Sequence, residues 1–109
     1  MRFVLWPNEL DARLSRKYGR AVKKSVAVDS PGLEEVEDAV LSLGFKVVEK
    51  VPEKLNPRLS GLDEEFRTRG MLVVESPYGK GKTLKLIAEK IRELRARTRA
   101  KGKSRRKRR

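Results

Sequence analysis

Cysteine and histidine are both absent from this chain of 109 residues, a length that suits one small domain. Without cysteine there is no disulfide framework, no thiolate nucleophile and no Cys-ligated metal. Without histidine the chain lacks the commonest general base at neutral pH and the usual zinc ligand. Catalytic sites of the Ser-His-Asp and Cys-His types are therefore excluded, and we expect no metal site.

Long apolar runs are missing as well. The first run, Phe3 to Trp6, is stopped by Pro7 and is too short for the apolar core of a secretory signal. No stretch approaches the roughly 20 apolar residues that a membrane-spanning helix needs. We therefore expect a cytoplasmic protein that does not insert into membranes.

Acidic residues are few for the basic content: 15 Asp and Glu stand against 28 Lys and Arg, a net charge of +13. Residues 95–109 hold ten of the basic residues and no acid, which leaves 18 basic and 15 acidic residues, a net +3, in residues 1–94. A second acid-free basic window spans residues 13–24, and an acidic segment follows at residues 29–38. Adjacent patches of opposite sign steer a polyanion.

The end of the chain, residues 99–109, is predicted to be a disordered basic tail. Its like charges repel, and nothing apolar offsets the entropy of ordering it. Runs this basic commonly contact nucleic acid and less often an anionic membrane surface. A membrane-bound helix needs large apolar residues opposite its charges, but residues 95–109 offer only Ala96 and Ala100. RNA or DNA is therefore the favoured partner.

The first half of the chain predicts a strand, a loop and a helix. Residues 2–6 have the character of a short buried strand, and residues 8–24 that of a long loop with one helical turn. Ser30 is expected to cap a helix whose first residue is Pro31, and Gly44 to follow its last turn. The apolar stripe of this helix consists of Leu33, Val36, Val40 and Leu43.

The second half predicts two strands and a second helix. Residues 45–51 and 71–75 are the strands, separated by a long polar loop at residues 53–69. Thr83 is expected to cap the last helix. The apolar residues of that helix recur at helical spacing as Leu84, Ile87, Ala88, Ile91 and Leu94.

These elements predict an α+β fold of order βαββα. Two amphipathic helices and three short strands suit two layers, with the helices packed on one face of a small sheet. We expect an RNA-binding α+β domain over residues 1–98, followed by the tail at residues 99–109.

A GKGKT segment at residues 79–83 lies between a strand and a helix, which is the setting of a phosphate-binding P-loop. That loop needs glycine five residues before Gly81, where this chain has Ser76, and Pro77 lacks a backbone N–H that such a loop uses. We interpret the segment as a basic turn at a helix start close to a phosphate, and we expect no cofactor. Its candidate RNA contacts are Lys80 and Lys82.

Residues 69–73 begin like the first RNP motif of an RNA-recognition fold. That motif needs aromatic residues on the strand to stack bases, but Met71, Leu72 and Val73 stand there. Recognition is therefore expected from loops. Tyr18 lies among charges and either stacks on a base or is an ordinary exposed tyrosine. The aromatic residues expected in the core are Phe3, Trp6, Phe45 and Phe66.

Two loops place arginine beside glycine, as Gly19-Arg20 and Arg69-Gly70. Arginine offers a planar fork to phosphates and base edges, and glycine lets the backbone approach a sugar-phosphate chain. A single arginine is usually a solvated surface charge, but two such pairs beside the basic window favour RNA. The full set of candidate RNA-binding residues is Arg13, Arg16, Lys17, Tyr18, Gly19, Arg20, Lys23, Lys24, Arg58, Arg67, Arg69, Gly70, Lys80 and Lys82.

Several short motifs follow one another in a distinctive order: Trp6-Pro7, Leu10-Asp11, Arg13, Ser15-Arg16-Lys17, Gly19-Arg20, Ser30-Pro31, Gly44-Phe45, Pro57-Arg58 and Arg69-Gly70. Their order and spacing resemble the 19-kilodalton subunit of the signal recognition particle in its archaeal form. The likeness covers nearly all of residues 2–98, and many members carry a basic tail of this kind. The chain departs from the family pattern at Glu9 and Ala21.

The resemblance implies an antiparallel three-stranded sheet and a monomeric protein without catalytic activity. It implies binding to the particle's 7S RNA at the tips of two hairpin arms, helices 6 and 8. Clamping these arms side by side prepares the RNA for the GTPase subunit in protein targeting, with contact to that subunit mainly through the RNA. The contacts that the family places in its two loops correspond to Arg13, Arg16, Lys17, Gly19, Arg20, Arg58, Arg69 and Gly70.

Three alternatives remain from the residues themselves. A ribosomal protein that binds ribosomal RNA shares this size and charge. A small P-loop enzyme would hydrolyse ATP or GTP and would need Lys82. A membrane-surface module would act through the tail and bind vesicles of anionic lipid.

Overall fold

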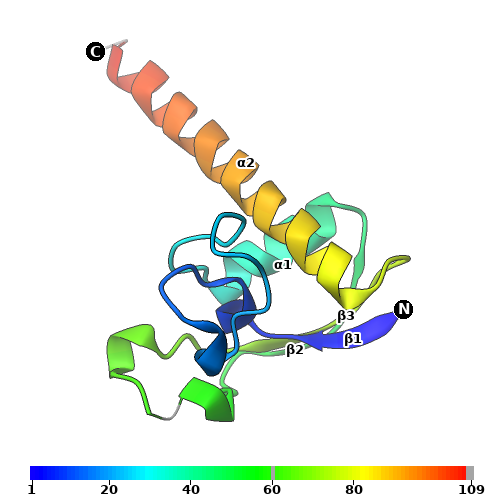
Figure 1. Cartoon of the computed structure of the whole chain (residues 1–109). Helices are drawn as coiled ribbons and strands as arrows, with labels where there is room; N and C mark the ends of the chain where they lie inside the picture. Colours follow the sequence, from blue (N-terminus) through cyan, green and yellow to red (C-terminus); the bar gives the residue numbers. More distant parts are fainter. Residues whose placement is uncertain (60, 108–109) are drawn as a thin grey trace.

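The computed structural model describes residues 1–59 and 61–107, and its two α-helices lie on one face of a three-stranded sheet (Figure 1). The main elements are β1 (Arg2–Leu5), α1 (Leu33–Ser42), β2 (Lys46–Val51), β3 (Met71–Glu75) and α2 (Lys80–Lys107). Four 3-10 turns lie in the loops: η1 (Pro7–Leu10), η2 (Arg16–Tyr18), η3 (Pro57–Leu59) and η4 (Glu64–Phe66). The predicted α+β class and the βαββα order are confirmed.

The sheet has the order β1-β3-β2, and both outer strands run antiparallel to β3. The central strand is the one whose residues are mostly buried, because it has neighbours on both sides. Leu5 pairs with Leu72 and Phe3 with Val74, so these side chains share the face that the helices cover. On the other side of β3 the register shifts between Val47 and Glu49 of β2.

The core is almost entirely aliphatic. α1 packs on α2, and the fully buried side chains between the helices and the sheet include Val36, Val40, Ile87 and Ile91. Burial of one such side chain stabilises the fold by about 1.5–3 kcal/mol. The prediction of an aromatic core is right in part. Phe3 and Phe45 pack against this core, whereas Trp6 and Phe66 are half-buried and lie outside it.

The start of α1 differs from the prediction. Ser30 has a left-handed backbone (φ +49°) and is not the cap, and the helix begins at Leu33. Gly32 occupies the capping position, so the helix start has no side-chain cap. At the other end Gly44 takes φ +82°, as predicted for the residue that follows a helix.

The start of α2 also differs from the prediction, because the helix begins at Lys80 and not at Thr83. The Thr83 hydroxyl is buried inside the first turn, 2.9 Å from the carbonyl oxygen of Gly79 and 3.0 Å from the Ser76 hydroxyl. It fastens the helix start to the turn after β3. A magnesium-binding hydroxyl of a P-loop would have to face a nucleotide instead.

The far end of α2 runs clear of the rest of the molecule (Figure 1). Its helical backbone continues to Lys107, whereas we predicted a tail without structure from residue 99. The tail's last two residues, 108 and 109, lie outside the described residues. The division of the chain at residue 98 stays a prediction. Within the described part, no helix is long and apolar enough to cross a bilayer, and no group of acidic residues is arranged to hold a metal.

Candidate nucleic-acid interface

The first loop, residues 6–32, is held in one conformation by its own backbone. Ala12 N–H donates to the Val28 carbonyl (2.8 Å), and Val28 N–H donates to that of Leu10 (2.9 Å). Leu10, Leu14 and Val22 are buried, so the loop has apolar anchors as well. Backbone pairing and burial together offset the entropy of ordering a loop of this length.

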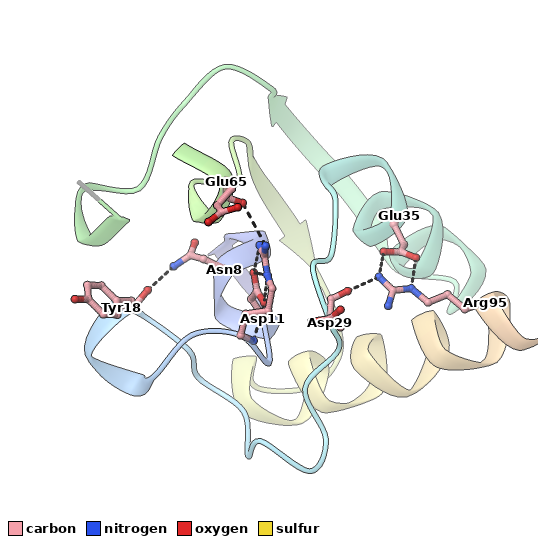
Figure 2. A network of polar contacts seen from close by, with 8 residues as sticks. Asn8, Asp11, Tyr18, Asp29, Glu35, Glu65 and Arg95 are labelled. Carbon is pink, nitrogen blue, oxygen red and sulfur yellow. Dashed lines mark hydrogen bonds and ion pairs between the residues drawn. The ribbon is translucent and has the colours of Figure 1, made fainter. Parts of the chain in front are cut away.

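Two arginines of α2 fasten the same loop from outside. Arg92 donates from Nη2 to the carbonyl oxygens of Ser25 (2.9 Å) and Ala27 (2.6 Å). Arg95 donates to the Asp29 carbonyl (2.9 Å) and forms two 2.6 Å bonds to the Glu35 carboxylate (Figure 2). The pKa of Arg95 is raised above its ordinary value, first by the hydrogen bond to Glu35. The loop therefore stands as a fixed platform.

Arg13 links the first loop to the second loop, residues 52–70. Its guanidinium binds the fully buried Asp11 carboxylate, with Nη2 2.9 Å from Oδ2. From its other side Nη1 donates to the Glu65 carbonyl (3.2 Å), and the guanidinium carbon lies 5.1 Å from the centre of the Phe66 ring. The side chains of Asp11 and Glu65 are labelled in Figure 2. Arg13 thus has its partners inside the protein.

Gly19 of the first loop packs close to Arg58 of the second loop. It takes φ +98°, and a Cβ added there would lie 2.6 Å from Nδ2 of Asn8 and 3.5 Å from Cδ of Arg58. The buried Asn8 side chain donates from Nδ2 to the Tyr18 carbonyl (3.0 Å; Figure 2). Glycine is required here by both the backbone angle and the lack of space.

Arg20 follows with its guanidinium turned toward its own loop. Nε donates to the Val22 carbonyl (3.0 Å) and Nη1 to the Leu14 carbonyl (2.9 Å). These two bonds fix the rotamer of Arg20 before any ligand binds. Its positive charge is therefore pre-oriented, which lowers the entropy cost of binding.

A cleft of about 350 Å³ forms where the two loops approach the start of α2. It brings together four of the predicted residues, Gly19, Arg20, Arg58 and Lys80. Its remaining walls come from Trp6, Glu9, Ala21 and Asn56.

The Glu9 carboxylate would oppose any anion in this cleft, but it is neutralised there. Lys80 Nζ lies 2.8 Å from its Oε2, and the Trp6 N–H donates to its Oε1 (2.8 Å). Lys80 therefore acts on the cleft through Glu9. We call these eight wall residues the loop cleft.

The remaining predicted cations fall into two groups, those with an acidic partner and those without one among the described residues. Arg67 contacts Glu64 (3.5 Å) and the Leu62 carbonyl (2.6 Å), and Arg69 lies 3.9 Å from Glu64. A different group is exposed and has no acidic partner among the described residues: Arg16, Lys17, Lys23, Lys24, Arg58 and Lys82. These cations can meet phosphates without first breaking an ion pair.

Some predicted residues lie outside the loop cleft. Lys82 sits over the Tyr78 ring, 4.3 Å from its centre, and Lys24 lines a hollow beside Arg92. Gly70 is buried with φ +118°, and an added Cβ would lie 2.7 Å from the Leu33 side chain. Gly70 therefore has a packing role that needs no contact with RNA.

Sequence reasoning missed three residues that shape the loop cleft: Trp6, Asn8 and Asn56. Trp6 is a cleft wall, and Lys54 Nζ lies 6.0 Å from the centre of its ring. Asn56 is buried, and its Oδ1 accepts from the Arg58 N–H (3.0 Å), which sets the turn that presents Arg58. Asn56 directly before η3 was an available signal, because asparagine often bonds nearby backbone, whereas Asn8 bonds a carbonyl ten residues away.

A larger hollow, about 1020 Å³, lies elsewhere between α1, β2 and α2. Its wall carries Glu34, Glu35 and Asp38. Carboxylates repel phosphates, so volume alone does not make this hollow a site for a polyanion. Glu34 and Glu35 lie in the first turn of α1, where the helix dipole favours negative charge.

A two-layer α+β domain that displays unpaired cations around two long loops has the features of a nucleic-acid-binding protein. The family model for the SRP19 protein matches residues 4–94. The chain belongs to the SRP19 family.

Relatives of high similarity agree with this assignment. The signal recognition particle 19 kDa protein of Thermococcus kodakarensis is 66% identical over 91% of this chain and 92% of its own length. A solved structure of SRP19 from Pyrococcus furiosus is 58% identical, covers 92% of this chain and 96% of its own, and superposes with a TM-score of 0.79. An SRP19 solved in complex with the S domain of signal recognition particle RNA is 29% identical over 82% of this chain and 95% of its own, with a TM-score of 0.70.

Proposed function

We propose that this protein binds the RNA of the signal recognition particle as an assembly protein. The loop cleft contacts the tips of RNA helices 6 and 8 and clamps them side by side. The clamped RNA is then ready for the GTPase subunit, with which the protein communicates mainly through the RNA. The protein does this in the cytoplasm, without catalysis.

The observation that carries the proposal is the joining of the two loops at Gly19 and Arg58. Arg13 joins the two loops through its hydrogen bond to the Glu65 carbonyl, and the loop cleft is lined by residues of both loops. One rigid unit that presents cations from both loops can hold two RNA segments at a fixed separation. RNA that seldom adopts this arrangement alone would be stabilised in it, because the protein binds the clamped form more tightly.

The side chains of the loop cleft favour recognition of RNA by its shape and its sugar-phosphate backbone. Arginine pairs with phosphate oxygens through two parallel hydrogen bonds. The 2′-hydroxyl of RNA can both donate and accept a hydrogen bond. Backbone N–H and carbonyl groups around Gly19, which has no side chain to block the approach, suit such a group. Strand β3 contains no aromatic residue on which a base could stack. The contacts with RNA are therefore left to the loops.

The test is footprinting of 7S RNA with and without the protein. We expect protection confined to the tips of helices 6 and 8. Arg58→Gln, which removes an unpaired cation of the loop cleft, should weaken binding about tenfold, in line with one charge-assisted contact. Arg2→Gln is the matched control, since Arg2 is an exposed arginine of β1 that pairs with Glu75 (3.9 Å) and lies outside the loop cleft. Protection elsewhere on the RNA, or equal binding by Arg58→Gln and the parent, would contradict the proposal.

The competing candidate is a protein of the ribosomal type. It predicts tight binding to ribosomal RNA and indifference to 7S RNA. A competition experiment with both RNAs at equal concentration separates the two candidates. The effect on the GTPase subunit is tested by measuring its affinity for 7S RNA with and without this protein, and we expect the affinity to rise.

A further inference from the structure

A second groove, of about 370 Å³, lies beside the loop cleft. It runs between the later part of the first loop and the first turns of α2. Ala21 lines both the groove and the loop cleft, so the two hollows adjoin. The other wall residues of the groove are Val22, Lys23, Ser25, Val26, Gly81 and Lys85.

Lysines stand on both walls of this groove. Lys23 comes from the first loop and Lys85 from α2, and both side chains are exposed. Neither has an acidic partner in residues 1–59 and 61–107. Lys90, further along the same helix, differs because its Nζ lies 3.4 Å from the Glu93 carboxylate. The groove therefore carries two positive charges that no ion pair among the described residues offsets.

We propose that Lys23 and Lys85 extend the RNA-binding surface, so that one RNA strand passes from the loop cleft across Ala21 into this groove. The proposal rests on the proposed function and adds Lys85 of α2 to the RNA-binding surface, opposite Lys23 of the first loop. Small side chains at Ala21 and Gly81 leave the passage open. Lys85 was not among the residues that the sequence singled out.

The ligand of the groove is the sugar-phosphate backbone. Lysine binds phosphate as a point charge and lacks the planar fork with which arginine reads base edges, and the other wall residues are small or apolar apart from one serine. No aromatic side chain is among the groove's wall residues, so there is nothing on which a base could stack. The contacts are therefore expected to strengthen binding equally for any RNA sequence that follows this path.

The test compares the full chain with the double variant Lys23→Gln/Lys85→Gln for binding to 7S RNA over a range of salt concentrations. The plot of log K against log salt has a negative slope, and each lost phosphate contact should reduce the magnitude of that slope by about 0.7–0.9. We expect the magnitude of the slope to fall by about 1.5 and the affinity at low salt to fall about tenfold or more, with unchanged circular dichroism. Ethylation interference should show phosphates that matter for the parent and not for the variant.

Lys46→Gln is the matched control, because Lys46 is also an exposed cation without an acidic partner among the described residues but lines neither hollow. The inference requires the double variant to lose far more than Lys46→Gln. If the double variant keeps the parent's slope while Arg58→Gln loses affinity, the groove is not a binding site and the proposed function stands. If neither the parent nor any variant prefers 7S RNA, the proposed function fails, and this inference fails with it.

Discussion

The guanidinium of Arg13 holds the buried carboxylate of Asp11, with Nη2 2.9 Å from Oδ2 and Nε 3.1 Å from Oδ1. Asp11 also accepts from the Arg13 backbone N–H (2.9 Å). The hydrogen bond to Asp11 is the first cause of a raised pKa of Arg13. An arginine that looks like a surface cation in the sequence is therefore part of the structure that joins the two loops.

Arg13→Met should destabilise the protein by about 3 kcal/mol, because it leaves the buried Asp11 carboxylate without its ion-pair partner. Chemical denaturation measures the loss. Arg97→Gln, which breaks an exposed pair with Glu93, is the control and should cost about 0.5 kcal/mol or less. A loss no greater than the control's would mean that the pair contributes little.

The same pair predicts a flat pH response near neutrality. A raised arginine pKa gives stability that is fully present below the ordinary arginine pKa and lost only as the pH rises through the folded value. Neutral pH lies far below both values. Arg13 should therefore cause no change in the unfolding free energy of the parent between pH 6 and pH 8, measured by denaturation in matched salt.

Gly70→Ala should lower the free energy of unfolding by about 3 kcal/mol, from a strained backbone and an overpacked contact. Gly70 has φ +118°, and the new Cβ would lie 2.7–2.9 Å from three atoms of Leu33. Gly61→Ala is the control, since an added Cβ there meets no described atom within 4 Å. If Gly70→Ala is as stable as the parent but loses RNA binding, Gly70 serves RNA and not packing.

Arg92→Met should loosen the first loop without unfolding the domain. It removes the hydrogen bonds to the Ser25 and Ala27 carbonyls. Native-state hydrogen exchange at the amides of Ala12 and Val28 should become about five- to thirtyfold faster, because each of the two lost hydrogen bonds contributes about 1 kcal/mol to local stability. Exchange in the β3 amides is the internal control and should not change. Unchanged exchange at both loop amides would show that the loop does not depend on α2.

Deletion of residues 99–109 removes eight basic residues and should weaken binding to every RNA. The slope of log K against log salt should become shallower, because fewer counterions are released. The ratio of affinities for 7S RNA and a random hairpin should stay the same, measured by filter binding at two salt concentrations. A lower ratio would mean that the tail takes part in recognition.

Much of the fold could be predicted from local patterns. The strand at residues 71–75 and the stripe of α2 from Leu84 to Ile91 follow hydrophobic periodicity, which burial enforces on one face. The starts of both helices were misplaced, because caps depend on backbone geometry. Ser30 satisfies the preference of a cap, yet its φ of +49° turns the chain away from the helix.

The sequence by itself determined the class of the protein, since the charge imbalance, the absent catalytic residue types and the motif order do not depend on distant contacts. Which cations are free was decided only by the tertiary structure. Arg13 and Lys80 find Asp11 and Glu9, whereas Arg58 and Lys85 stay exposed. An ion pair depends on where folding places a carboxylate in space, and a list of charges along the chain does not contain that distance.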